Sequence, residues 1–196
     1  MAEDGRTPRL LRKGDLAAAE TLYRRALEAR ERVLGPEHPD TPNSVATLGS
    51  LLRAKGDLAA AESLFRRAVE ASERVLGPEH PDSLINLSNL AGLLRDTGDL
   101  PAAESLYRRA LEVSERIFGH EHPTTLRNLK NLAVLFEDKE NYTTAEALYR
   151  RVLDGRQRVL GTQHPDTIRT RQNLINLLEK MGRLDEASQL RNELPG

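Results

Sequence analysis

Cysteine is absent from the 196-residue sequence, and aromatic residues make up only 4% of it. Without cysteine the chain forms no disulfide and offers no thiolate to a metal ion. No run of about 18 apolar residues occurs, so the sequence predicts no helix that spans a bilayer. The first residues also lack the apolar core of a secretory signal. We therefore expect a cytoplasmic protein without a membrane partner.

Charge of one sign is also lacking, because 29 basic and 30 acidic residues leave a formal net charge of −1. Such a chain has no overall attraction to nucleic acid, which is therefore not an expected partner. Charged residues make up 30% and apolar residues 38%, a balance too apolar for a disordered chain. The abundant residues are alanine, leucine, glutamate and arginine, which favour helices.

The sequence repeats itself with a period of 42 residues. Each repeat carries a glycine followed three residues later by His-Pro, and these glycines are Gly35, Gly77, Gly119 and Gly161. A second mark, usually Gly-Asp, keeps the same period and begins at Gly14, Gly56, Gly98, Glu140 and Gly182. The two marks divide each repeat into two segments, which predicts a pair of helices per repeat.

The second full repeat illustrates the predicted helices. Its first segment runs from about Asp82 to Thr97 and its second from about Asp99 to Phe118. We expect Asp82 or Ser83 to cap the first helix, and Asp99 to cap the second. Pro101 fits the first turn of the second helix, and Gly98 can take the left-handed conformation that ends the first.

The surfaces and contacts of these helices are also predictable. Small residues allow the helices to approach closely, and they are Ala61, Ala68, Ala103, Ala110 and Ala145. Glutamate stands four residues before arginine on the second helices, an order that stabilises a helix by about 0.2–0.5 kcal/mol per pair. These pairs are Glu20–Arg24, Glu28–Arg32, Glu62–Arg66, Glu70–Arg74, Glu104–Arg108, Glu112–Arg116 and Glu146–Arg150. One hairpin cannot bury both faces of its helices, so neighbouring hairpins are expected to stack.

The spacing of apolar and small residues resembles that of the tetratricopeptide repeat. The residues that carry this resemblance in the second full repeat are Leu87, Leu90, Ala91, Leu94, Ala103, Tyr107 and Ala110. The usual repeat of that family has about 34 residues. The 42-residue period, with His-Pro between repeats, is similar to the type found in kinesin light chains. The resemblance implies an all-α, right-handed superhelical solenoid of antiparallel helix hairpins, with about nine helices, that acts as a non-catalytic protein-interaction scaffold.

The resemblance divides the chain into one solenoid and a short leading segment. Residues 1–9 are expected to be poorly ordered, and residues 10–194 to form the solenoid. The solenoid comprises a partial repeat 10–34, repeats 35–76, 77–118 and 119–160, and a capping repeat 161–194. Asp15–Leu34 is the second helix of the incomplete first hairpin, and the last helix is about Leu184–Leu194. Arg171 and Arg191 replace apolar residues in the last repeat, which predicts a solvent-facing cap.

Four histidines, one in each His-Pro loop, are the most obvious candidates for chemistry. They are His38, His80, His122 and His164. Neighbouring helices would hold them about 10 Å apart, whereas zinc needs all its ligands within about 2.3 Å. We therefore expect each to order its own loop through the local backbone. No phosphate-binding loop, nucleophile elbow or zinc-protease motif occurs, and so neither enzyme activity nor a cofactor is predicted.

By resemblance, the first helix of each hairpin lines the concave surface where this family binds peptides. The residues expected there are Arg53, Asn89, Arg95, Arg127, Lys130, Asn131, Arg169 and Asn173. Arginine can hold a carboxylate with two hydrogen bonds, which favours a protein partner with an acidic segment. Asp96, Glu137, Asp138 and Glu179 make the surface mixed rather than uniformly basic.

Two alternatives remain open from the sequence. Asn89, Asn131 and Asn173, which are 42 residues apart, either grip the backbone of a bound peptide or bond to the adjacent helix and hold the repeats in register. The chain itself is either a peptide-binding adaptor or an architectural array that associates through its N-terminal hairpin.

Overall fold

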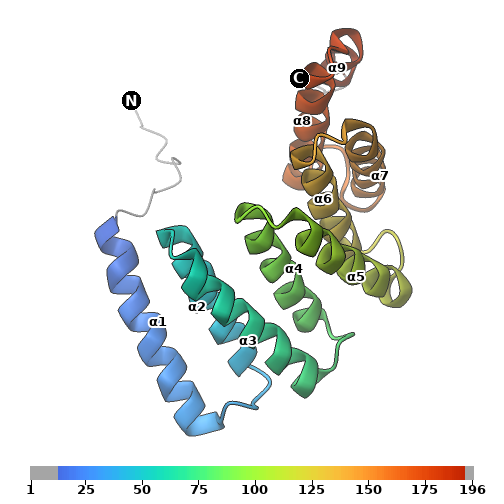
Figure 1. Ribbon diagram of the computed structural model, residues 1–196. Helices are drawn as coiled ribbons and strands as arrows, with labels where there is room; N and C mark the ends of the chain where they lie inside the picture. The colour runs from blue at the N-terminus through green and yellow to red at the C-terminus, as the bar shows by residue number, and fades with distance from the viewer. Residues whose placement is uncertain (1–12, 193–196) are drawn as a thin grey trace, which may run out of the picture.

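The computed structural model describes residues 13–192. This part of the chain contains nine helices joined by short loops, and no strand (Figure 1). The helices are α1 (Lys13–Leu34), α2 (Thr41–Lys55), α3 (Leu58–Leu76), α4 (Pro81–Asp96), α5 (Leu100–Phe118), α6 (Pro123–Asp138), α7 (Tyr142–Leu160), α8 (Pro165–Lys180) and α9 (Leu184–Asn192). Residues 1–9, which were expected to be poorly ordered, lie outside the described residues. None of the nine helices is both long and apolar enough to cross a bilayer.

The helices form a solenoid in which each packs against the next in sequence. In Figure 1 the hairpins follow one another in chain order, from α1 at one end to α8 and α9 at the other. Direct packing of α4 against both α2 and α6 places these first helices side by side. The all-α solenoid predicted from the 42-residue period is therefore confirmed.

The core consists of small and large apolar residues in alternation. Ala61, Ala68, Ala103, Ala110 and Ala145 are all fully buried, as their expected role in close helix packing requires. The aromatic residue of each second helix, Phe65, Tyr107 or Tyr149, is buried as well. Deep burial of these rings beside alanines is what lets consecutive hairpins share one core.

The second helices begin as their sequences predict. The side chain of Asp57 accepts a hydrogen bond from the amide of Ala60 at 3.2 Å, and that of Asp99 accepts one from Ala102 at 3.1 Å. Asn141 does the same for Thr144 at 3.2 Å. Each of these bonds satisfies an amide that the first turn of a helix leaves free.

The first helices begin differently from the prediction. His80, not Asp82 or Ser83, is the N-cap of α4, and its Nδ1 accepts a hydrogen bond from the amide of Asp82 at 3.1 Å. His122 and His164 cap α6 and α8 in the same way, and each is followed by proline at the first helical position. The expectation that each histidine binds its local backbone is confirmed, but the cap residue itself was misidentified.

Glu140 is the exception among the residues that end the first helices. Gly56, Gly98 and Gly182 have φ angles of +85°, +88° and +75°, a left-handed region that costs glycine little. Glu140 occupies the equivalent position with φ +57°, and is the one non-glycine residue with positive φ in the described chain. The start of α7 therefore stores strain that the other hairpins avoid.

Only part of the predicted Glu–Arg pairing within the second helices is observed. Pairs form at Glu20–Arg24, Glu62–Arg66, Glu104–Arg108 and Glu146–Arg150, at 2.7–2.8 Å. Arg74 and Arg116 instead pair with Glu37 and Glu79 in the preceding loops. The structure records no pair between Glu28 and Arg32. In α3 and α5 the arginine in the second half of the helix therefore joins it to the His-Pro loop at the start of its own repeat.

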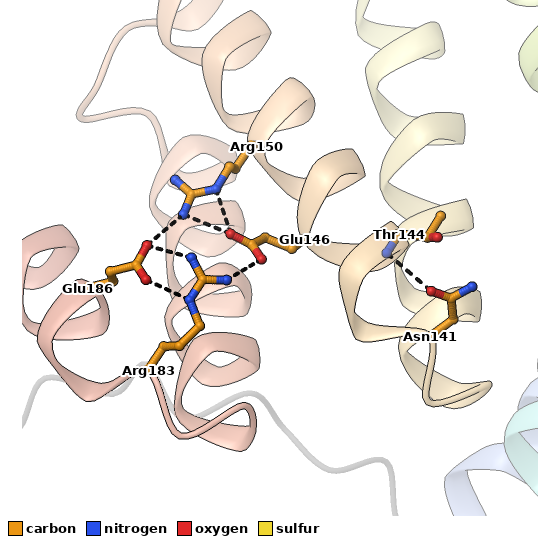
Figure 2. A network of polar contacts seen from close by, with 6 residues as sticks. All are labelled: Asn141, Thr144, Glu146, Arg150, Arg183 and Glu186. Carbon is orange, nitrogen blue, oxygen red and sulfur yellow. Dashed lines mark hydrogen bonds and ion pairs between the residues drawn. The ribbon is translucent and has the colours of Figure 1, made fainter.

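The C-terminal hairpin is held by a network of four charged residues (Figure 2). Arg183 pairs with Glu146 of α7 at 2.5 Å and with Glu186 of α9 at 2.6 Å, and Arg150 bonds to both glutamates. Partial burial would raise the pKa of Glu146, but hydrogen bonds from Arg183 and Arg150 lower it below its usual value. The network joins the short α9 to the preceding hairpin.

The predicted solvent-facing cap is only half correct. Arg191 is exposed and pairs with Glu179. Arg171 is only 2% exposed, however, and its Nε and Nη1 atoms are buried without a partner in the described chain. Its position corresponds to the buried Leu129 and Leu87 of earlier repeats, so the helical face, rather than the side-chain chemistry, determines its burial.

Candidate functional site

A basic cleft lies between α6 and α8 on the side formed by the first helices. Its volume is about 440 Å³. While α4 packs directly against α2 and α6, no comparable contact joins α6 to α8 in residues 13–192, which leaves room for the cleft. The lining residues are Pro123, Thr124, Arg127, Lys130, Asn131, Arg156, Asp166 and Arg169. We refer to this set as the basic cleft.

Four of the predicted site residues meet in the basic cleft. Arg127, Lys130 and Asn131 come from α6, and Arg169 comes from α8. The first three are half-buried, and Arg169 is exposed. Successive positions on the same helix face bring the α6 residues together, as the sequence pattern predicts.

Arg127 and Lys130 are held in the cleft without an acidic partner in the described chain. Desolvation lowers the pKa of Arg127, whose Nη2 atom is buried and has no hydrogen-bond partner in the described residues. Desolvation also lowers the pKa of Lys130, and the nearby charges of Arg95, Arg156 and Arg169 lower it further. Both side chains therefore lie where water and counter-charge are reduced.

Sequence reasoning missed Arg156 of α7, the fourth cation of the cleft. It is buried, and its Nη1 donates to the carbonyl of Asp166 at 2.9 Å and to the Thr170 hydroxyl at 2.6 Å. Neutral acceptors orient this charge without cancelling it. The equivalent residues of the two preceding hairpins are Ser72 and Ser114, whereas Arg30 of α1 occupies the same position and makes the same contacts with Asp40 and Ser44. The change from serine to arginine after Ser114 is the signal that could have found Arg156.

Asp166 is the one carboxylate that lines the cleft. Its Oδ1 lies 3.6 Å from Nη2 of Arg169, too far for a strong hydrogen bond. The cleft also lies at the first turns of α6 and α8, where the helix dipoles favour negative charge. Four cationic side chains against one carboxylate make this part of the surface an anion-binding site in electrostatic terms.

Arg53 and Arg95, two further predicted site residues, are engaged elsewhere. Arg53 of α2 pairs with Asp96 of α4 at 2.5 Å, and Arg95 of α4 pairs with Asp138 of α6 at 3.3 Å. Lys180 of α8 and Glu137 of α6 make the next contact of this ladder at 2.5 Å, with the signs reversed. These charges join consecutive first helices, and their ion pairs largely compensate them.

The predicted asparagine ladder does not bond to the protein itself. Asn131 lines the basic cleft, and Asn173 lines a neighbouring depression of about 260 Å³ that also contains Glu137 and Asp138. Asn89 lies in neither. All three side chains are half-buried, and none has a hydrogen-bond partner within residues 13–192. The interpretation that they hold the repeats in register is therefore not supported.

Another asparagine, Asn128, joins the repeats. Its Oδ1 accepts a hydrogen bond from the Ser88 hydroxyl of α4 at 2.9 Å. Its amide nitrogen donates to the carbonyl of Ala110 and to the Ser114 hydroxyl, both in α5 and both at 3.2 Å. This buried contact joins three helices and leaves the cleft side of α6 free for other contacts.

The histidines do not converge. Each accepts a hydrogen bond within its own loop, and no group of three or more metal-ligating side chains gathers in the part of the chain that is described.

Comparisons with known proteins agree with this architecture. The sequence model described as tetratricopeptide repeat matches residues 10–73, 43–112, 82–157 and 129–193. A search of curated proteins gave no match.

Solved structures give the same fold. A variant of a putative kinesin light chain with nearly identical repeats from Podosopora anserina is 23% identical, with a TM-score of 0.76 over 92% of this chain and 85% of that one. BtubC (BKLC) from P. vanneervenii is 25% identical, with a TM-score of 0.77 over 94% and 78% of the two chains. The apo form of RapI is 14% identical, with a TM-score of 0.74 over 92% and 48%.

Proposed function

This chain belongs to the tetratricopeptide-repeat family, with repeats of the kinesin-light-chain type, and we infer that it is a protein-interaction scaffold. We propose that its basic cleft binds an acidic segment of a protein partner. The observation that carries the proposal is the pair Arg127 and Lys130, half-buried cations without an acidic partner in the described residues. A carboxylate in the cleft would supply the missing counter-charge.

The rest of the cleft suits an extended peptide. The amide of Asn131 offers both a donor and an acceptor to a peptide backbone, and it is not engaged by the described protein. Glu137 and Asp138 lie in the adjacent depression, so the negative charge of the ligand belongs at the end of the groove near the N-termini of α6 and α8. The other predicted positions, Arg53, Asn89, Arg95 and Asn173, are proposed as secondary contacts only.

The test is a peptide-array screen, followed by titration of the bound peptides against variants. We expect acidic peptides with micromolar affinity, about −8 kcal/mol, and binding that weakens as salt rises. The change Lys130→Ala should weaken binding about tenfold, or about 1.4 kcal/mol. Lys55→Ala, which removes a lysine of α2 that is already paired with Glu20 and lines neither the cleft nor the adjacent depression, is the matched control and should bind like the parent. A preference for basic peptides, or equal binding by Lys130→Ala with its fold intact, would refute the proposal.

A second candidate function is self-association through α1. Tyr23 of α1 is 44% exposed, whereas the equivalent Tyr107 and Tyr149 are 2% and 1% exposed. Leu22, Val33 and Leu34 of the same helix are exposed as well. At Tyr23 and Leu22, α1 therefore exposes apolar surface that the other second helices bury wholly or in part, whereas Ile117 and Val159, two counterparts of Val33, are exposed as well. A second copy of the chain could cover the surface at Tyr23 and Leu22.

A further inference from the structure

The number of positive charges in the basic cleft exceeds what one carboxylate can neutralise. Arg127, Lys130 and Arg156 face the cleft without an acidic partner in the described chain, and Arg169 has only a long contact to Asp166. A glutamate or aspartate of a peptide brings one negative charge. A phosphate monoester brings nearly two, together with three strong acceptor oxygens.

The geometry also favours a compact group with several acceptors. The cations come from three helices, α6, α7 and α8, and surround one space of about 440 Å³. Arginine forks and the lysine ammonium can each take a different oxygen of the same phosphate. A carboxylate offers two oxygens whose acceptor sites lie close to one plane, whereas the three phosphate oxygens point in different directions, as donors from three helices require.

The surroundings favour a single phosphate on a peptide over the repeating phosphates of a nucleic acid. Glu137 and Asp138 line the next depression along the groove, and the chain as a whole carries a formal charge of −1. A continuous polyanion would find no excess of positive charge beyond the cleft, because Lys180 and Arg95 are paired with these carboxylates, whereas a peptide can place neutral residues there.

We propose that the basic cleft recognises a phosphorylated serine or threonine in an extended segment of a partner protein. The proposal rests on the proposed function, because it specifies the acidic group of the same ligand. Binding would then depend on modification of the partner, since loss of the phosphate removes the charge that fills the cleft.

The experiment uses three capped peptides of one sequence, taken from the array screen, with phosphoserine, glutamate or serine at the central position. Affinities are measured for the full chain at about pH 7.5 and about pH 5, on either side of the second phosphate pKa of about 6. At the higher pH we expect the phosphoserine peptide to bind about tenfold more tightly than the glutamate peptide, and the serine peptide to bind weakest. At the lower pH the preference should shrink, because the phosphate becomes a monoanion. The glutamate peptide is the control, because a change of the protein with pH would alter its affinity for both peptides equally.

Variants locate the effect. Lys130→Ala should remove most of the preference for phosphoserine, and Lys55→Ala, at a lysine paired with Glu20 outside the groove, should keep it. Equal binding of the glutamate and phosphoserine peptides would overturn the phosphate proposal and leave the acidic-peptide function standing. Failure of both to bind better than the serine peptide would overturn both. Tight binding of a short single-stranded oligonucleotide at the cleft would also overturn the proposal, in favour of nucleic acid.

Discussion

Asn86 is a buried residue whose hydrogen bonds are missing. It is the counterpart, one repeat earlier, of Asn128, yet both its Nδ2 and Oδ1 are buried without a partner in the described chain. The donor that serves Asn128 is the Ser88 hydroxyl, and the corresponding residue for Asn86 is Ala46. A buried amide without partners costs free energy that one hydroxyl could recover.

We expect the change Ala46→Ser to stabilise the protein by about 1 kcal/mol, because the new hydroxyl can donate to Oδ1 of Asn86. The free energy of unfolding in denaturant measures the effect. The control is the same change in an Asn86→Ala background, where the gain should vanish. An equal gain in both backgrounds would show that the serine acts without Asn86.

At the level of residues, four of the eight side chains predicted to contact a ligand lie together in one cleft. Arg127, Lys130, Asn131 and Arg169 line one cleft because the helical period and the 42-residue period together fix which side chains share a face. Arg53 and Arg95 were predicted to contact the ligand, but each pairs with an aspartate of the protein that stands 43 residues further along the chain. That offset depends on how consecutive first helices are staggered, which no local pattern reveals.

At the scale of helices, the boundaries were predicted to within one or two residues where the ends fall in the described chain, and the reason is local. Proline, the Asp or Asn caps and the glycine marks act on the turn in which they stand. The predicted cap of α4 was wrong because a neutral histidine can accept an amide hydrogen bond through Nδ1 as an aspartate does, which ordinary cap preferences overlook.

Helix α9 has nine residues, so its attachment depends on the charge network of Figure 2. Hydrogen bonds lower the pKa of Glu186, through Arg183, and that of Glu146, through Arg183 and Arg150 despite partial burial. A carboxyl whose pKa is lower in the folded state stabilises the fold above its unfolded pKa of about 4.3. This stability is lost as the pH falls through the folded pKa.

We therefore expect the parent to lose stability as the pH falls from about 5 to about 3, and Arg183→Ala to lose less over the same range. Unfolding monitored by circular dichroism at several pH values measures the two slopes. Arg66→Ala, which breaks only the exposed pair with Glu62, is the matched control and should retain nearly the full slope of the parent. Identical slopes for Arg183→Ala and the parent would show that the network does not contribute.

For the whole molecule, the exposed face of α1 has a testable consequence. If a second copy covers it, the weight-average mass in sedimentation should rise with protein concentration. Leu22→Glu places a charge on this face and should keep the chain monomeric. Leu184→Glu changes an equally exposed leucine, in α9, and should associate like the parent. A parent mass that stays constant over a wide concentration range would rule out this mode of association.

The fold of the whole molecule could be predicted from the sequence more fully than any site on it. A 42-residue period requires only that each hairpin bury its faces against the next, and this is what the helices do. The burial of Arg171 and the strained φ of Glu140 were not predicted from the sequence. In both cases the repeat fixes the backbone position, which is buried at Arg171 and left-handed at Glu140, although the residue there is not of the usual type.

The gap between α6 and α8 links ligand occupancy to the dynamics of the C-terminal hairpin. Elsewhere consecutive first helices pack directly, but α8 contacts α6 through the Lys180–Glu137 ion pair and is otherwise anchored, with α9, through α7 and the Arg183 network. A ligand that bridges α6 and α8 would add a second connection near their N-termini, and its binding free energy would oppose local opening of that hairpin. Amide hydrogens of α8 and α9 would then exchange with solvent more slowly when the cleft is filled, so the end of the solenoid would report on the state of its groove.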